Sequence, residues 1–340
     1  MANQSEINLI VVGDAGFKEN ALERRVANAM DLYRQGLHHD GDGTEISLDA
    51  VVLTGDNFED QQFQDAVKTQ FQEAFASFDV PFYVTLGNHD LPASKARAEW
   101  DFGQPGRRGS RGPRWTVGSA WPFTHYRIDL PSPQEPLVTL IELDSTVSAR
   151  VREGETFLRA QLDQIAQDMN KRWVVVFTHY PLYTNGCHQE GSEFPNRWKP
   201  LLQGRVHFYL SGHNHNLEHL EVEDPPGKPL STSFILSGAG GQIYKLRTHK
   251  HGPFARSLAG FFHIRFQRDK AHVKVIGLER NQEPEEARIV HSFERDFSTG
   301  KVTVNTPADT RTGAVPLALF EGDIGGPDVL TGLCGEPPVS

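Results

Sequence analysis

The chain has 340 residues, of which 38% are hydrophobic and 23% charged, so a folded globular core is expected. No apolar run reaches the roughly 18 residues of a membrane span, and the net charge of −10 argues against a general affinity for nucleic acid. These properties exclude a membrane-spanning protein and a nucleic-acid scaffold.

The N-terminus and the cysteines bear on the cellular compartment. The polar segment 1–6 lacks the basic and apolar regions of a signal peptide, which predicts a cytoplasmic protein as the sequence stands. A mature protein whose signal had been removed would look the same and would be exported. Cys187 and Cys334 are the two cysteines, and so few make no disulfide framework; we expect them to stay unpaired.

The first part of the chain alternates short apolar runs with helical patterns. Buried strands are predicted over 7–12, 50–54 and 82–86, and helices between them over 19–35 and 65–78. The apolar stripes of the two helices are Leu22, Val26, Ala29, Met30 and Tyr33, and Val67, Phe71, Ala74, Phe75 and Phe78. This βαβαβ order predicts a parallel sheet covered by helices.

The segment 101–121 interrupts this rhythm and is predicted to be a long loop, because glycine and proline recur in it. It carries four arginines, for which a solvated basic surface is favoured over recruitment of an anionic substrate: Arg107, Arg108, Arg111 and Arg114. A further helix is predicted over 156–169. Further strands are predicted over 126–130, 137–143, 173–177, 207–210, 217–222, 233–236, 260–266 and 273–278.

The order of these elements predicts an α/β fold, a four-layer αββα sandwich in which two mixed β-sheets pack face to face and helices flank them. Residues 1–297 would form the main domain. Residues 298–340 are rich in glycine and proline and are expected to be a loosely structured C-terminal extension.

Polar motifs follow five of the predicted strands. They are Gly13-Asp14-Ala15-Gly16, Gly55-Asp56-Asn57-Phe58-Glu59, Gly87-Asn88-His89-Asp90, Thr178-His179-Tyr180-Pro181 and Gly212-His213-Asn214-His215. Ligands of open α/β sheets bind in the crevice outside the carboxyl ends of the strands, so these five loops are expected to converge on one point.

The residue types in these loops suit a metal centre. Carboxylates, imidazoles and an amide oxygen favour iron, manganese or zinc, and the absence of thiolate argues against a structural zinc site. Each residue taken alone has a simpler interpretation: Asp14 could cap a helix, Asp56 could belong to a turn, and His179 could be a hydrogen-bonded histidine of the core. Their occurrence together, each at the end of a strand, favours the metal interpretation.

The constellation resembles the calcineurin-like metallophosphoesterases and, within them, the small, mammalian-type purple acid phosphatases. The closer resemblance rests on the segments 55–58, 121–126 and 237–241, and on His188, which matches a substrate-facing histidine of that group. It covers roughly residues 7–297, which would then be the catalytic domain. The resemblance implies two metal ions, drawn from iron, manganese and zinc.

The resemblance also implies which residues bind the metals. One ion would be held by Asp14, Asp56 and His215, and the other by Asp56, Asn88, His179 and His213, with Asp56 as the bridge. Purple acid phosphatases have a metal-bound tyrosine where this chain has Glu59. Glu59 would either bind the first metal or hold a water beside it, and a protein without the purple colour is expected.

The activity implied is hydrolysis of phosphate monoesters by attack of a metal-bound hydroxide on phosphorus. Asn88, His89 and His188 would contact the phosphate, and His89 and His188 would protonate the leaving group, against the alternatives of a structural His89 and a His188 on a mobile loop. Alternatives are a phosphodiesterase acting on cyclic nucleotides or other diesters, and a non-catalytic phosphate or metal sensor. The substrate would be a small molecule or a phosphoprotein.

Two remaining features are assigned no role in the chemistry. The residues His249, Lys250 and His251 follow the glycine-rich segment 237–241, and a surface position is favoured for them over a position above the predicted site. Cys187, next to His188, is not expected to be a nucleophile.

Overall fold

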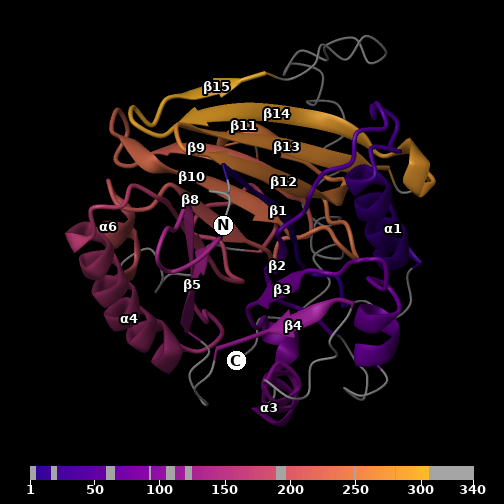
Figure 1. Cartoon of the computed structure of the whole chain (residues 1–340), viewed down its shortest axis with the longest axis horizontal. Coiled ribbons are helices and arrows are strands. Elements are labelled where there is room, and N and C mark those ends of the chain that lie inside the picture. Colours follow the sequence, from indigo (N-terminus) through magenta and orange to yellow (C-terminus); the bar gives the residue numbers. More distant parts are fainter. Residues whose placement is uncertain are drawn as a thin grey trace.

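The computed structural model describes residues 5–16, 21–58, 66–91, 93–104, 112–118, 125–188, 197–248, 250–279 and 281–305. In this part of the chain the strands form two sheets, and helices lie outside them, with α1 on one side and α4 and α6 on the other (Figure 1).

The larger sheet has eight strands in the order β15-β14-β13-β12-β1-β2-β3-β4. Its strands are β1 (Glu6–Val12), β2 (Ala50–Leu53), β3 (Pro81–Val84), β4 (Arg114–Thr116), β12 (Ala259–Gln267), β13 (Lys270–Leu278), β14 (Arg288–Asp296) and β15 (Val302–Val304). The strands β1 to β4 are parallel, whereas β12 pairs with β1 in antiparallel fashion and β13 to β15 continue that pattern. The sheet is therefore mixed.

The second sheet has seven strands in the order β11-β9-β10-β8-β7-β6-β5. Its strands are β5 (Tyr126–Leu130), β6 (Val138–Glu142), β7 (Trp173–Phe177), β8 (Phe208–Ser211), β9 (Leu217–Glu223), β10 (Pro229–Ser237) and β11 (Gly252–Arg256). The strands β6, β7, β8 and β10 are parallel, and the edge strands are antiparallel to their neighbours.

The helical segments of the described residues lie between strands. They are α1 (Leu22–Arg34), α3 (Ala93–Phe102), α4 (Ser148–Gln167), α6 (Lys199–Leu202), the π-helix η1 (Val67–Gln72) and the 3₁₀ turns η2 (Asn88–Asp90) and η3 (Pro284–Glu286). None of the helices described is both long and apolar enough to cross a membrane.

The alternation of side chains along β1 shows how the layers are held together. Ile7, Leu9 and Val11 pack into the core between the two sheets, while Ile10 and Val12 face the opposite way and pack against α1. A separate core lies between the outer face of the second sheet and α4. Because both faces of each sheet are covered, the central strands are apolar almost throughout. The predicted four-layer sandwich is confirmed.

The predicted loop over 101–121 is wrong in part. Helix α3 continues to Phe102, and Arg114–Thr116 forms β4, which pairs with β3. A strand of three residues is too short to show an alternating pattern, so it could not be predicted from the sequence. Trp115 of β4 is buried and stacks on Phe58, with ring centroids 5.2 Å apart.

Other boundaries also differ from the predictions. Helix α4 begins at Ser148 instead of residue 156, since only Val151 and Gly154 of its first turns are buried and no apolar stripe marks that part. Strands β11 and β14 were not predicted, and β15 lies within the expected extension. Residues 306–340 of that extension lie outside the described residues.

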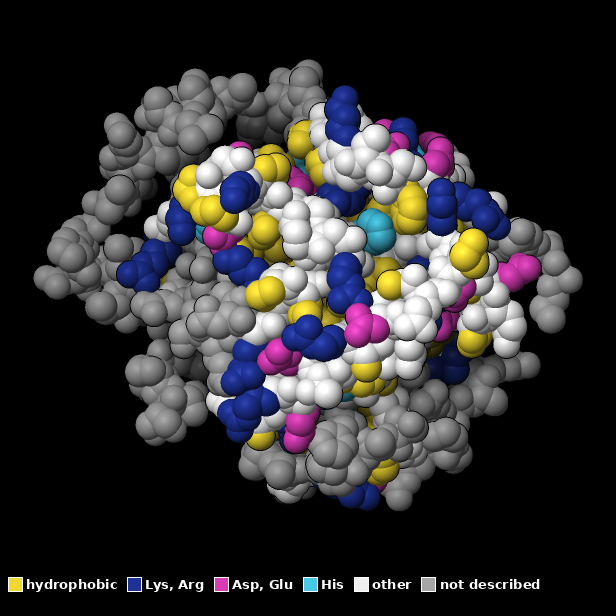
Figure 2. Space-filling model, turned by 90° about the vertical axis from the view of Figure 1, so that its left-hand side faces the viewer, with side chains coloured by type: hydrophobic (Ala, Val, Ile, Leu, Met, Phe, Trp, Pro, Cys, Tyr) yellow, Lys and Arg dark blue, Asp and Glu magenta, His cyan; other side chains and the backbone are white. Residues whose placement is uncertain are grey.

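The surface over α4 carries charges of both signs. Figure 2 shows Lys and Arg side chains interspersed with Asp and Glu on this face. Pairs such as Arg159 with Glu155, 3.1 Å apart, and Arg205 with Asp163, 2.6 Å apart, account for part of this mixture. Exposed pairs of this kind contribute little to stability, so the stability of the fold rests on the three apolar cores.

Candidate metal centre

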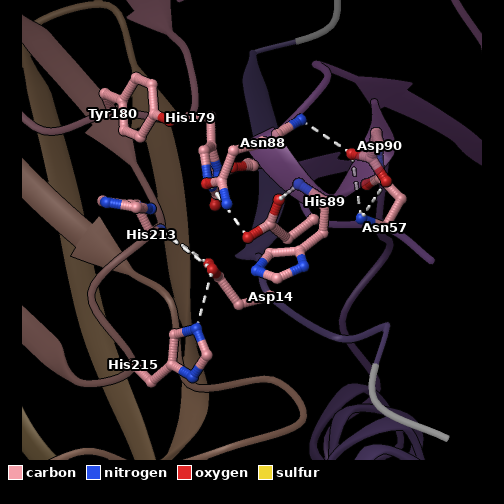
Figure 3. Close-up of polar contacts among 12 residues, drawn as sticks. Asp14, Asn57, Asn88, His89, Asp90, His179, Tyr180, His213 and His215 are labelled. Carbon is pink, nitrogen blue, oxygen red and sulfur yellow. Dashed lines mark hydrogen bonds and ion pairs between the residues drawn. The ribbon is translucent and has the colours of Figure 1, made fainter. Parts of the chain in front are cut away.

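Five loops meet where the carboxyl ends of β1, β2 and β3 face those of β7 and β8. Figure 3 shows Asp14, Asn88 and His89, from the first sheet, opposite His179, His213 and His215, from the second. The strands place these side chains at one point although the residues are up to 201 positions apart in the sequence. The expected convergence of the five motifs is thus found in the structure.

The backbone of this site is strained at three of the residues expected to bind metal. Asp14, Asp56 and His213 have positive φ angles of 55°, 50° and 69°, and they are the only described residues other than glycine with such angles. A left-handed conformation costs L-residues roughly 1–3 kcal/mol, and it persists where the surrounding structure enforces it. Each follows a strand and a glycine, and the turn directs its side chain inward.

Two glycines make room for the carboxylates. A Cβ atom on Gly87 would lie 2.0 Å from Oδ1 of Asp56, and one on Gly212 would lie 2.4 Å from Oδ2 of Asp14. Neither position therefore accepts a larger residue without moving a buried carboxylate. The glycine in each motif is required by this close approach.

The potential ligand atoms form two groups that share one residue. Asp56, His179 and His213 form one group, and Asp14, Asp56 and His215 form the other; in each group the candidate atoms lie within 4.8 Å of one another. Asn88 joins the first group, because its Oδ1 lies 3.0 Å from Nε2 of His179. The residues that the resemblance assigns to each ion thus lie together in one of the two groups, and their binding of metal stays a prediction.

The hydrogen bonds of His179 fix the direction of its free nitrogen. Its Nδ1 lies 2.9 Å from the carbonyl oxygen of Thr54, which can only accept, so Nδ1 carries the proton. Nε2 then faces oxygen atoms of Asn88 at 3.0 Å and of Asp56 at 3.3 Å. Nε2 of His179, Oδ1 of Asn88 and Oδ2 of Asp56 are therefore three acceptors directed at one point. A positive charge is required between them, and either a second proton on His179 or a metal ion supplies it.

The pKa values of these buried groups also indicate that positive charge is stabilised at this site. Burial alone would lower the pKa of His179, but the Asp56 carboxylate outweighs it and raises the pKa to about 9. Burial also opposes ionisation of Asp56, yet His179 holds the pKa of that carboxyl below its usual range. At Asp14 burial prevails and raises the pKa, although His215 opposes it.

Asp14 is held by the turn that carries two of the histidines. The backbone N–H of His213 donates to both of its carboxylate oxygens, at 3.1 and 2.9 Å, and Nε2 of His215 lies 3.3 Å from Oδ1. In the described part of the chain, imidazoles are the ion-pair partners of both Asp14 and Asp56. Buried carboxylates of this kind suit a metal ion.

Asp90 links the loop after β2 to the loop after β3 through hydrogen bonds. Its carboxylate accepts hydrogen bonds from the backbone N–H of Gly87 at 2.7 Å, of Asn57 at 3.0 Å and of Phe58 at 3.2 Å. Lys95 of α3 donates to the carbonyl oxygens of Phe58 and His89. The spacing between Asp56 and Asn88 is therefore set by groups outside the centre itself.

The two histidines expected to contact substrate flank the ligand groups. The backbone N–H of His89 donates to Oδ1 of Asp56 at 2.8 Å, so His89 adjoins the shared carboxylate. The ring of His188 lies 4.6 Å from that of His213, centroid to centroid. Burial and the neighbouring imidazoles lower the pKa of His188.

Several predicted features fall outside the described residues: Glu59, Arg107, Arg108, Arg111, His249 and Cys334. Arg114 is paired with Asp79 at 2.5 Å. Lys250 is exposed, and the backbone N–H of His251 donates to Oδ1 of Asn185, so this segment lies beside the loop that carries His188.

The expectation of an unpaired Cys187 was wrong, because Cys187 is disulfide-bonded; it is no nucleophile.

Several residues that shape the site were assigned no role from the sequence. The ring of Tyr244 stacks on that of His215, with centroids 4.1 Å apart and planes 12° apart. Asn214, the middle residue of the His-x-His motif, binds the backbone of His188, and Asn185, in the same loop as His188, links that loop to Glu218 and His251. The position of Asn214 between two histidines was a signal that could have been used, whereas the sequence around Tyr244 contains none.

Comparison with known proteins agrees with this geometry. The family model described as calcineurin-like phosphoesterase matches residues 7–217. Tartrate-resistant acid phosphatase type 5 of Mus musculus is 25% identical over 302 residues, which cover 76% of this chain and 83% of that protein. Purple acid phosphatase 17 of Arabidopsis thaliana is 26% identical over 258 residues, covering 72% and 71%. The resemblance to the purple acid phosphatases is confirmed.

Solved structures share the fold. The protein described as GAP50, the anchor in the inner membrane complex of Plasmodium, superposes with a TM-score of 0.63 at 19% identity, covering 84% of this chain and 89% of that one. The structure of PhoD gives a TM-score of 0.60 at 12% identity, covering 92% and 74%. At these identities the likeness concerns the fold alone.

Proposed function

Because this chain belongs to the calcineurin-like phosphoesterase family and is a metal-dependent phosphatase, we propose that it hydrolyses phosphate monoesters at a centre of two metal ions. The observation that carries the proposal is the pair of ligand groups that share Asp56. Two ions held by one shared carboxylate would lie close enough to act on the same phosphoryl group.

The donor set fits such a centre. One ion would be held by Asp14, Asp56 and His215, and the other by Asp56, Asn88, His179 and His213. Carboxylate, amide and imidazole donors suit iron, manganese or zinc. When bound, the ions would lower the pKa of a water that serves as nucleophile and would offset negative charge on the phosphoryl oxygens.

The residues around the ions would orient the substrate. The backbone N–H of His89 donates to Asp56, and its imidazole would contact a phosphate oxygen or the departing alkoxide. His188 would approach the leaving group from the side of His213. A positioned imidazole that protonates the leaving group contributes typically 10²–10⁴-fold to the rate.

The choice of monoesters is supported by the named relatives. Acid phosphatases from mouse and Arabidopsis are similar to this chain over at least 72% of its length. The natural substrate on this proposal is a small molecule or a protein that carries a phosphomonoester. A phosphomonoester carries two negative charges on its non-bridging oxygens at neutral pH, and the two metal ions would offset them.

The test compares an aryl phosphate monoester with the matching aryl diester on purified protein reconstituted with manganese, zinc or iron. We expect the value of kcat/KM to be higher for the monoester with each active metal. Asp163→Asn, on the exposed surface of α4, is a control that should leave the ratio unchanged. A higher kcat/KM for the diester would contradict the proposal and identify a phosphodiesterase.

A further inference from the structure

The side chain of Asn214 holds the backbone of His188 at two points. The backbone N–H of His188 donates to Oδ1 of Asn214 at 2.8 Å, and Nδ2 of Asn214 donates to the carbonyl oxygen of His188 at 3.3 Å. An amide is the side-chain group that offers an acceptor and a donor side by side, so it can engage both backbone groups of one residue. Asn214 is fully buried, so its amide is shielded from solvent.

Asn214 is also part of the turn that presents His213 and His215. Its backbone N–H donates to the carbonyl oxygen of Gly212 at 2.9 Å, and its own carbonyl oxygen accepts from Asn216 at 2.8 Å. Any displacement of the turn therefore moves the amide that holds His188. The 184–188 loop packs closely on this amide, because a Cβ atom on Gly186 would lie 2.3 Å from Oδ1 of Asn214.

Asn185 supplies further hydrogen bonds to the 184–188 loop. The backbone N–H of Asn185 donates to Glu218 at 2.7 Å, and the side chain of Asn185 exchanges hydrogen bonds with the backbone of His251 at 2.8 and 3.0 Å. These bonds anchor the start of the loop. At the end of the loop, next to the disulfide-bonded Cys187, the side chain of Asn214 holds the backbone of His188.

We propose that Asn214 is a positioning residue that fixes His188 against the leaving group of the substrate, so that the turn which binds the metals also places the candidate acid. This inference rests on the proposed role of His188. Asn214 itself would bind neither metal nor substrate. The loss of Asn214 should therefore act only through His188.

The inference predicts a specific dependence on the leaving group. Poor leaving groups need a proton, whereas a nitrophenolate leaves without one, so misplacing an acid matters only for the former. We expect Asn214→Ala to lower kcat by about 10-fold for alkyl phosphates, within the cost of a small misplacement, and by much less for nitrophenyl phosphate. Asn214→Asp keeps the size and the acceptor for His188 N–H but loses the donor, and should show a smaller loss.

A double-mutant cycle separates positioning from a structural role. We would measure kcat and KM for the holoenzyme and for Asn214→Ala, His188→Ala and the double variant, with metal content determined for each. If Asn214 acts through His188, the double variant has the same leaving-group dependence as His188→Ala alone. Asn8→Ala removes another buried asparagine, one bonded to His263, and should not change that dependence.

Three results would overturn the inference. Additive losses in the double variant would mean that Asn214 acts independently of His188. Metal loss from both Asn214 variants would assign the residue to the metal centre. A His188→Ala variant with normal rates on all leaving groups would remove the role of His188, and with it this inference, while metal-dependent monoester hydrolysis by the wild-type protein would still stand.

Discussion

Nε2 of His179 lies 3.3 Å from Oδ2 of Asp56, and the two residues follow strands of different sheets, β7 and β2. The contact is reinforced by the hydrogen bond from Nδ1 of His179 to the carbonyl oxygen of Thr54. Two sheets whose inner faces form one apolar core are thus joined at their carboxyl ends by polar groups that require a cation. This relationship leads to the following predictions.

Asp56→Asn should weaken both metal sites at once, because Asp56 belongs to both ligand groups. The loss of activity should exceed the roughly 10–100-fold that is typical when a residue beyond the direct ligands is changed. Metal analysis after dialysis and assay on an aryl monoester would check this, with Asp163→Asn as the matched surface control. Near-normal turnover with full metal content would show that Asp56 is not the bridge.

His89→Ala should lower turnover by about 10²-fold or more while both metals stay bound, since the observed contact of His89 with Asp56 is made by its backbone. The loss should shrink for good leaving groups if the imidazole donates a proton. An equal loss for all leaving groups would point to phosphate binding alone. Loss of metal would make His89 a ligand instead.

Removing the metals should lower the melting temperature. Asp14 and Asp56 are almost completely buried, and in the described part of the chain their ion-pair partners are imidazoles. A ligand that binds only the folded state stabilises it in proportion to the logarithm of its concentration over Kd. Thermal unfolding with and without a chelator, followed by addition of manganese or zinc, would measure the effect. Asp56→Asn should respond much less, and an equal response would contradict a specific site.

Stability should fall as the pH is lowered from about 6.5 toward 3. Burial, aided by Lys274 and Arg265, lowers the pKa of His263 to about 3. Between that value and the unfolded value of 6.5, the unfolded imidazole binds a proton that the folded one does not, so folding is penalised progressively as the pH decreases. The total penalty is on the order of 5 kcal/mol.

His263→Gln tests the assignment of this acid sensitivity. The glutamine retains hydrogen-bonding capacity toward Tyr33 and Asn8, which contact the imidazole at 2.8 and 3.1 Å, but it does not titrate. Urea unfolding at several pH values should give a flatter dependence for the variant. An unchanged slope would assign the sensitivity to other groups, among them His291, whose pKa burial also lowers to about 3.

Glu59 leads to a prediction about colour. On the resemblance to the purple acid phosphatases, Glu59 would stand where those enzymes have a metal-bound tyrosine, and a carboxylate cannot supply the phenolate charge transfer that their colour implies. Protein loaded with ferric iron should therefore lack a purple band, and Glu59→Tyr should acquire one. A purple wild-type protein would overturn this prediction.

The sequence predicted those parts of the molecule that depend on local pattern. Buried strands, their order and the polar motif after each strand could all be recognised, because a parallel sheet gathers such motifs at one edge. The contacts of Asn214 with His188 and of Tyr244 with His215 were not predictable, since they join loops that are 26 and 29 residues apart. Strand β4 was missed because three residues show no period.

The most direct test of the two-metal proposal is a titration of metal-free protein with manganese or zinc, with monoesterase activity measured at each step. The shared position of Asp56 in both ligand groups predicts that activity rises until two equivalents per chain are bound and that Asp56→Asn does not recover. Full activity at one equivalent, or a recovered Asp56→Asn protein, would contradict the account.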